Sequence, residues 1–291
     1  MLSASLVILG QHLLNGVLIG CSYALIAIGL TMIFGVMNIA NFAHGEFYML
    51  GGFLAFYLVS LLGLDYFLSL ALAVTLVVGL AVALQHGIFR QLRDKPLMTT
   101  ALVTIGLSIL LEHAALLLWG PQPQAIPTPF ATRPVNLFGV YTTRLYLFAM
   151  AVTVALIVLG HLVIRVTRMG KAMRATFQGK EAAALVGIRI DRIYMYAFTF
   201  GAGLAAASGA VLGGFIPVEP SMGGVATLKA FVVVILGGMG SFVGAIVGGL
   251  FLGLAEGLGA GYLSTGWKDA IGFIAVILVL LFRPEGLFRR V

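Results

Sequence analysis

Long stretches of this sequence carry no charged side chain. Residues 1–45 contain no Asp, Glu, Lys or Arg, and the same holds for 66–89, 145–164, 193–218 and 230–255. An α-helix rises about 1.5 Å per residue, so roughly 20 apolar residues cross the hydrocarbon core of a bilayer. Because lipid offers no partner for backbone N–H and C=O groups, such segments must be helices. The chain is therefore expected to cross a membrane several times.

The composition excludes a water-soluble enzyme. Charged residues make up 9% of the 291 positions and hydrophobic residues 61%, whereas soluble domains carry about 25% charged residues. The net charge of +7 is interpreted as basic residues kept on the cytoplasmic side rather than as a nucleic-acid surface. The single cysteine, Cys21, excludes an internal disulfide and a cysteine-based metal cluster.

We predict an all-α fold, a polytopic transmembrane helical bundle of about seven or eight spans in one domain, residues 1–291. The expected spans are 6–33, 41–62, 66–86, 98–119, 145–164, 193–216 and 268–283, with a further membrane-embedded element at 228–257.

The basic residues predict the orientation. Seven lie in 165–192, three in 90–95, and three near the end of the chain, at Arg283, Arg289 and Arg290. Cytoplasmic loops carry an excess of Lys and Arg, so all three clusters are expected inside. Counting three spans back from the cluster at 90–95 places the N-terminus outside, and the charge rule itself places the C-terminus inside.

A glycine cluster interrupts the element at 228–257. Three full crossings after residue 192 would place the C-terminus outside, against the charge rule. Gly237, Gly238 and Gly240 are expected to break the helix. We hypothesise that 228–239 and 242–257 are two half-helices that enter and leave on the same side, which is tolerated where they are buried in protein. The alternative is one long tilted helix with an external C-terminus.

Small residues also recur every four positions, a spacing that lets helix backbones approach closely. This predicts tight helix packing, with a direct role in lining a path as the alternative. The positions are Gly201, Ala205, Gly209, Gly213, Gly249, Gly253, Gly257 and Gly261.

Two loops differ in kind. The outer loop, 120–143, holds five prolines and is expected to be extended; it is either a docking surface for an external partner or a linker. The inner loop, 165–192, contains the helix-favouring stretches 169–177 and 181–186 and ends at Gly187, a plausible C-cap. A basic helical loop with apolar residues suits a membrane surface or a groove in a partner.

Polar side chains gather at the start of the second span: Asn38, Asn41, His44 and Glu46. Asn41 and His44 are three residues apart, so on a helix they would share roughly one face. Ionisable groups in lipid usually face a cavity or pair with each other. The cluster is therefore either part of the pathway or its gate, or a structural network that caps the helix.

Glu112 and His113 lie in the outer half of the fourth expected span. Glu112 would either contact the ammonium group of a zwitterionic substrate or pair with a polar neighbour.

The stretch from Glu181 to Gly187, EAAALVG, resembles the coupling loop of ATP-binding cassette importer permeases. In that family the short helix docks into a cleft of the cytoplasmic ATPase subunit. The resemblance assigns this role to Glu181, Ala182, Ala183 and Gly187.

A second stretch, 29–51 with the core NFAHGE, resembles the first two spans of permease subunits of branched-chain amino acid importers, of the H type. Further similar segments are 104–108, 236–241 and 282–288, so the resemblance covers nearly the whole chain. Glu112 and His113 depart from it, since relatives often carry neutral Gln or Asn there.

The resemblance implies a permease subunit that moves branched-chain or other amino acids across the bacterial inner membrane. No Walker A pattern occurs, so ATP and Mg are expected on a separate ATPase, with no cofactor on this chain. The implied partners are two ATP-binding subunits, a second permease subunit of the M type, an external substrate-binding protein and lipid. The five histidines are scattered, and neither H-E-x-x-H nor G-x-S-x-G occurs, so no enzyme or metal site is expected. The alternative is a secondary transporter or channel for a small polar solute.

Overall fold

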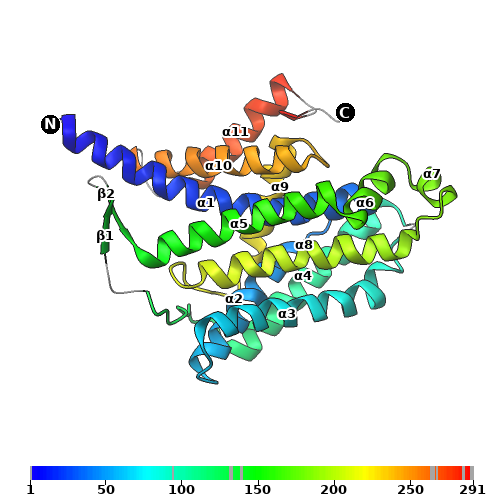
Figure 1. Ribbon diagram of the computed structural model, residues 1–291, viewed down its shortest axis with the longest axis horizontal. Helices are drawn as coiled ribbons and strands as arrows, with labels where there is room; N and C mark the ends of the chain where they lie inside the picture. Colours follow the sequence, from blue (N-terminus) through cyan, green and yellow to red (C-terminus); the bar gives the residue numbers. More distant parts are fainter. Residues whose placement is uncertain are drawn as a thin grey trace.

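The computed structural model describes residues 2–93, 95–130, 134–137, 140–262, 266, 268–283 and 286–288. Within them the chain forms a helical bundle whose long helices run roughly along one axis (Figure 1). Pro284, Glu285, Arg289 and Arg290, which belong to the expected C-terminal motif and basic cluster, lie outside the described residues.

The elements follow one another as α1 (Leu2–Met37), α2 (His44–Ser60), α3 (Tyr66–Leu84), the π-helical segment η1 (Gln85–Phe89), α4 (Leu97–Trp119), β1 (Pro134–Leu137), β2 (Val140–Thr143), α5 (Arg144–Val166), α6 (Arg168–Gln178), α7 (Lys180–Leu185), α8 (Ile190–Leu212), α9 (Met222–Gly237), α10 (Phe242–Tyr262) and α11 (Lys268–Phe282).

The prediction of a polytopic helical membrane protein is confirmed. Among the described residues, 6 helices are long and apolar enough to cross a membrane: α1, α3 with η1, α4, α5, α8 and α10. Helix α9 and the stretch 270–279 are shorter apolar helices. Helix α1 is longer than expected. The second span begins late, because residues 38–43 are not helical and α2 starts only at His44.

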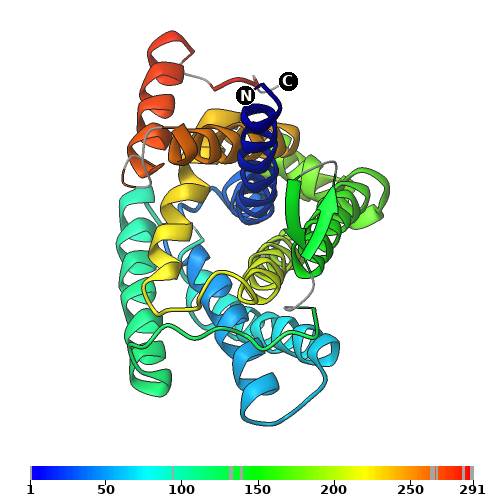
Figure 2. The same cartoon turned by 90° about the vertical axis from the view of Figure 1, so that its left-hand side faces the viewer.

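Helix α1 lies at the centre of the bundle, in contact with α5, α8, α9 and α10 (Figure 2). Glycines make this close packing possible. A Cβ at Gly20 would lie 2.9 Å from the carbonyl oxygen of Gly249 in α10, and one at Gly201 would lie 2.8 Å from that of Gly29 in α1. The repeated small residues therefore serve tight helix packing, as expected.

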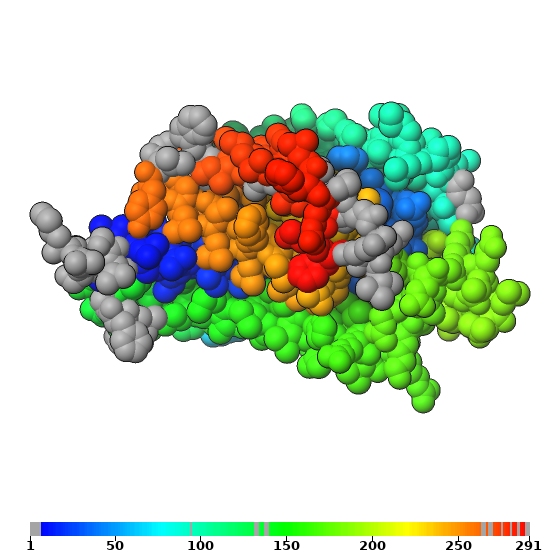
Figure 3. Space-filling view, turned by 90° about the horizontal axis from the view of Figure 1, so that it is seen from above, coloured from blue at the N-terminus to red at the C-terminus, as the bar shows by residue number. Residues whose placement is uncertain are grey.

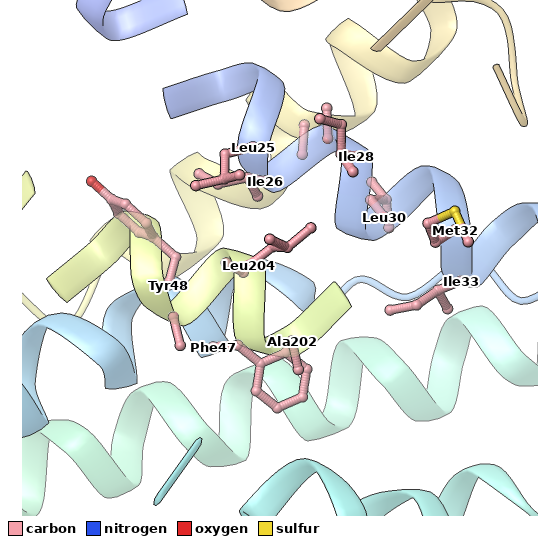
Figure 4. Packing of buried hydrophobic residues seen from close by; sticks show 14 of the residues in the cluster. Leu25, Ile26, Ile28, Leu30, Met32, Ile33, Phe47, Tyr48, Ala202 and Leu204 are labelled. Atoms are coloured by element: carbon pink, nitrogen blue, oxygen red, sulfur yellow. The ribbon is translucent and has the colours of Figure 1, made fainter. Parts of the chain in front are cut away.

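Large apolar side chains fill the space between the glycine contacts. Leu25, Ile28 and Ile33 of α1 are fully enclosed and share one cluster with Phe47 of α2 and Leu204 of α8 (Figure 4). On the outside, α3 and α4 expose rows of leucines, as expected for helices that face lipid.

The break between α9 and α10 falls at the predicted glycines. Gly238 and Gly240 have φ values of 95° and 88°, which glycine adopts without steric cost. The backbones of Gly237 and Gly244 meet, so the chain folds back on itself. A single continuous helix is therefore excluded for these residues.

The two arms of this hairpin are unequal. Helix α9 has 16 residues, but α10 has 21 and is long enough to span a membrane. The prediction of two half-helices was therefore right for α9 and wrong for α10, whose regular apolar repeat continues to Tyr262. The segment that leads into α9 and the far end of α10 both lie toward the end of the bundle that carries the outer loop, since Val218 pairs with Gln124 and Gly261 meets His12. The break lies beside Phe177 of α6, toward the opposite end (Figure 1).

The outer loop is more structured than an extended linker. Strands β1 and β2 pair antiparallel, with Val135 opposite Thr142 and Asn136 opposite Tyr141. β-branched residues favour this small hairpin, which the all-α prediction did not include. The loop also bonds to the segment before α9, where Ile126 N donates to Gly213 O at 3.0 Å.

The packing of α10 on α1 can be tested with one methyl group. A Cβ at Gly253 would collide with the backbone of Gly20, whereas one at Gly79 in α3 would meet nothing within 4 Å. Overpacking typically costs about 1–3 kcal/mol, so Gly253→Ala should melt several degrees lower in detergent. Gly79→Ala is the matched control and should melt at or slightly above the parent temperature. Equal melting temperatures for the two variants would contradict the proposed contact.

Candidate functional site

Two helices begin inside the bundle rather than at one of its ends. His44, the first residue of α2, hydrogen-bonds through Nε2 to the carbonyl oxygen of Ile26 at 3.1 Å. Ile26 precedes the end of α1 by 11 residues, or about 16 Å. The start of α9 lies at the same place, because Gly45 N donates to Thr227 Oγ1 at 2.8 Å. Helices α2 and α9 thus start side by side, reached by non-helical segments from opposite ends of the bundle.

Glu46 lies between these two helix starts. Its carboxyl group is fully buried, and Oε1 accepts a hydrogen bond from Ser108 Oγ of α4 at 2.7 Å. The same carboxyl group packs on Gly223 in the first turn of α9, where any Cβ would collide with it. Because helix N-termini carry partial positive charge, they stabilise an anionic side chain at this position. Gly223 therefore makes room for Glu46, whose carboxyl group joins the two buried helix starts.

The non-helical segment 38–43 is held by two threonines. Phe42 N donates to Thr104 Oγ1 at 3.2 Å, and the Thr104 hydroxyl donates to the carbonyl oxygen of Ala40 at 3.0 Å. From the other side, the Thr227 hydroxyl lies 3.2 Å from the carbonyl oxygen of Phe42. These contacts replace the hydrogen bonds that a helix would have supplied inside the bundle.

The expected polar cluster is only partly assembled. Asn41, His44 and Glu46 are buried together, but Asn38 is exposed at the end of α1, with a φ of 56°. The prediction that Asn41 and His44 share a helix face was wrong, because the helix begins at His44. Asn41 Oδ1 instead accepts from Ala43 N at 3.1 Å, a local turn contact that competes with helix formation.

Glu112 lies one helical turn beyond Ser108 on α4, and so on the same side of that helix. It is partly exposed, unlike Glu46. The structure therefore places Glu112 near the polar cluster without burying it.

A buried ion pair joins the two arms of the hairpin. Lys229 of α9 pairs with Glu256 of α10, and their side chains are 5% and 0% exposed. The hydroxyl of Tyr23 in α1 donates to Glu256 Oε2 at 2.9 Å. Charges in a membrane interior are costly unless they are paired, so this pair is a strong candidate for function.

Sequence analysis missed this pair, although a signal was present. The charge-free run 230–255 is bounded by Lys229 and Glu256, and the predicted glycine break lies between them. A chain that reverses at the break brings the two boundary residues onto facing helices.

Lys229 lines a recess that is open on one side and is formed by α1, α2, α8 and α9. Its polar lining consists of Ser22, Tyr23, Tyr48, Glu219 and Lys229. Its apolar lining includes Ile19, Ile26, Leu212, Ile216, Met222 and Val225. Such a site offers both signs of charge beside apolar walls, which suits a small zwitterion with an apolar side chain.

The inner loop forms the two helices that the sequence predicts, α6 and α7, at the end of the molecule opposite the start of α1 (Figure 3). Gly187 N donates to Ala184 O at 3.0 Å, and Ile188 N donates to Ala183 O at 3.1 Å. With a φ of 84° at Gly187, this is a Schellman turn, so the predicted C-cap is confirmed. The turn leaves Leu185 and Val186 88% and 77% exposed. Of the four expected coupling residues, Ala183 is buried and Glu181, Ala182 and Gly187 are exposed.

Helix α6 connects this loop to the core. A Cβ at Gly35, near the end of α1, would lie 3.1 Å from the ring of Phe177, and the same ring packs directly on Gly240 at the helix break. The loop 90–95 joins the same region, since Arg93 pairs with Asp191 at the start of α8. Two basic clusters that were expected on one side therefore meet at one end of the bundle.

The apolar spans and the charged groups buried between them are features of a polytopic membrane transport protein. The chain belongs to the family described as "Branched-chain amino acid transport system / permease component", whose family model matches residues 12–280. It is 37% identical to the high-affinity branched-chain amino acid transport system permease protein LivH of Escherichia coli K12, over 96% of this chain and 95% of the relative. The identity to the permease protein BraD of Pseudomonas aeruginosa is also 37%, with the same coverage.

A more distant relative is the probable branched-chain amino acid transport permease protein LivH of Methanocaldococcus jannaschii, 28% identical over 90% of this chain and 87% of the relative. Among solved structures, PsaBC from Streptococcus pneumoniae in complex with Fab matches with a TM-score of 0.52 and 14% identity, covering 93% of this chain and 91% of that one. This structural similarity shows the shared fold.

The ion pair gives a stability test. Glu256→Gln leaves the Lys229 ammonium buried without its carboxylate, and loss of one partner of a buried pair costs about 3–5 kcal/mol. The single variant should accumulate poorly in membranes and melt far below the parent in detergent. Replacing both residues, Lys229→Met with Glu256→Met, removes the unpaired charge and should recover most of the lost stability. A double variant no more stable than the single one would show that the pair itself is not the source of the effect.

Proposed function

We propose that this permease carries branched-chain amino acids, or closely related ones, inward across the bacterial inner membrane as one subunit of an ATP-driven importer. The observation that supports this substrate class is the recess beside Lys229. It combines the ammonium group of Lys229, which is paired with Glu256, with the carboxylate of Glu219 and apolar walls. A substrate carboxylate would share Lys229 with Glu256, while its ammonium group and aliphatic side chain would meet Glu219 and the walls. The resemblance to relatives named for this transport supports the same proposal.

In this proposal the ATPase is a separate pair of subunits, which bind ATP and Mg. Helix α7 and its Schellman turn are the docking element, with Glu181, Ala182, Ala183 and Gly187 as the central residues. The exposed Leu185 and Val186 supply the apolar contact that a groove in a partner would cover. The basic residues around this loop support a cytoplasmic position for it, and in this proposal the N-terminus lies outside and the C-terminus inside.

The open side of the recess and the outer loop suggest where the two remaining partners would bind. A second permease subunit, of the M type, would complete the pathway opposite α1 and α9. An external substrate-binding protein would dock near residues 120–143, where the β1–β2 hairpin and the bonded segment at Gln124 give a firm surface.

Transport requires that motion of the docked loop reach the recess. Phe177 is packed on both Gly35 and Gly240, so a shift of α6 moves the end of α1 and the turn of the hairpin together. Lys229 and Glu256 lie on the two arms of that hairpin. A rigid-body movement of this kind would expose the recess to one side of the membrane at a time.

Docking of the ATPase is tested at Gly187. Gly187→Asp strains a residue with a φ of 84° and adds charge beside the exposed apolar tip. The variant should lose nearly all ATPase co-purification while the permease stays in the membrane, and Glu181→Lys should act in the same direction. Gly63→Asp is the matched control, because Gly63 also has a positive φ, 64°, with nothing near its Cβ position, but lies between α2 and α3. Unchanged co-purification for Gly187→Asp would refute the docking assignment.

The substrate class is tested at Glu219. Glu219→Gln removes the carboxylate of the recess while keeping its size, and charge-assisted hydrogen bonds contribute about 1.5–3 kcal/mol. Leucine uptake by the assembled importer should therefore fall roughly tenfold or more, with ATPase assembly unchanged. Competition by a panel of amino acids and by analogues without the ammonium group provides the second measurement. Wild-type uptake in the variant would remove Glu219 from the proposed site.

A further inference from the structure

A basic groove lies at the inner end of the bundle, far from the recess. It is formed where α3 passes into η1 and where α8 begins, and its charged lining comprises Arg90, Arg93, Arg192 and Asp191. Among the described residues, three arginines and one carboxylate line the groove, so these side chains give it a net charge of +2, counted as 3 − 1 with His86 neutral. A site with this balance favours an anion.

One arginine of the groove is held in place. Arg93 pairs with Asp191, and its guanidinium carbon lies 5.3 Å from the centre of the Tyr194 ring. Its Nε is buried and has no hydrogen-bond partner among the described residues. A buried donor without a partner is costly. Arg93 is therefore held in one orientation while one of its hydrogen-bond donors, Nε, lacks an acceptor among the described residues.

Helix α3 changes geometry to build the opposite wall. Over Gln85–Phe89 the helix widens to π-type bonds, for example from Arg90 N to Gln85 O at 2.9 Å. Such π-segments frequently occur at functional sites. Gln85 is 5% exposed, and its Oε1 accepts no hydrogen bond in the described part of the chain. An amide oxygen can accept a hydrogen bond from the hydroxyl of a glycerol headgroup.

The surroundings of the groove are apolar on the membrane side. Helix α3 is apolar and exposes large side chains along its length, among them Leu76 and Leu80. A ligand with a phosphate headgroup and acyl chains would therefore place its chains along α3 and its headgroup among the arginines. The tendency of basic residues to lie on the cytoplasmic side explains the exposed arginines. It does not explain the fixed orientation of Arg93 or the buried Gln85 Oε1 without a hydrogen-bond donor among the described residues.

We propose that this groove binds the headgroup of an anionic phospholipid. Exposed Arg90 and Arg192 bind the phosphate. Arg93, which is held by Asp191 and Tyr194, keeps a fixed positive charge beside it. Basic pockets between transmembrane helices on the cytoplasmic side are suited to this class of lipid.

The test measures thermal stability of the purified complex in detergent with added phosphatidylglycerol or phosphatidylcholine of the same acyl chains. The variant is Arg90→Gln with Arg192→Gln, because both side chains are exposed and their loss leaves the Arg93–Asp191 pair intact. The control is Arg165→Gln with Arg168→Gln, which removes the same charge from the same end of the bundle.

Phosphatidylglycerol should stabilise the parent and the control variant, and phosphatidylcholine should not. In the groove variant the half-saturating phosphatidylglycerol concentration should rise on the order of 25-fold, about fivefold for each arginine. Inorganic phosphate at the same concentration should not reproduce the effect. Equal losses in both variants, or equal stabilisation by the neutral lipid, would overturn the proposal. Loss of ATPase co-purification in the groove variant with an unchanged lipid response would assign the groove to a protein contact instead.

Discussion

Inside a hydrocarbon layer, every backbone N–H and C=O group needs a partner within the protein. Most of this chain meets that requirement with long helices, and the segment before α2 meets it in another way. Thr104 and Thr227 bind the backbone at Ala40 and Phe42 from two sides. This support allows α2 to start deep in the bundle beside α9. The burial of Glu46 between the two helix starts depends on the same support.

Close approach of helices is the second requirement. Gly29 and Gly201 bring α1 against α8, and Gly20 and Gly249 bring it against α10. With α1 enclosed on these sides, its Tyr23 reaches Glu256 and the recess forms along its remaining face. The small residues therefore position the polar groups, although they contribute no chemistry of their own.

The bundle was largely predictable because apolar length and charge-free runs are local properties of a sequence. The break at Gly237–Gly240 and the C-cap at Gly187 were predictable for the same reason, since each depends on the conformational freedom of a few residues. The β1–β2 hairpin was missed because the proline content of its loop suggested an extended chain. Asn41 was misplaced because its side chain forms a local turn instead of joining the helix.

The site was less predictable than the fold. Asn41, His44 and Glu46 were found because they are close together in the sequence. Their partners lie on other helices: Ser108 of α4 donates to Glu46, and Thr227 of α9 accepts from Gly45 N. The recess combines residues of four helices, and its arrangement depends on crossing angles that no single segment determines. Lys229 and Glu256 illustrate the limit: each was visible in the sequence, and only the folded hairpin shows them as a pair.

That pair also constrains how the chain enters the membrane during synthesis. Helix α9 has 16 residues and carries Lys229, so on its own it is short and bears a charge that costs about 2.5–3.5 kcal/mol to insert at the centre of a bilayer. Helix α10 alone would carry the carboxylate of Glu256 at a similar cost. Partition of the two helices as one neutral unit avoids both costs. We therefore expect α9 and α10 to enter the bilayer together, after α10 has emerged from the ribosome.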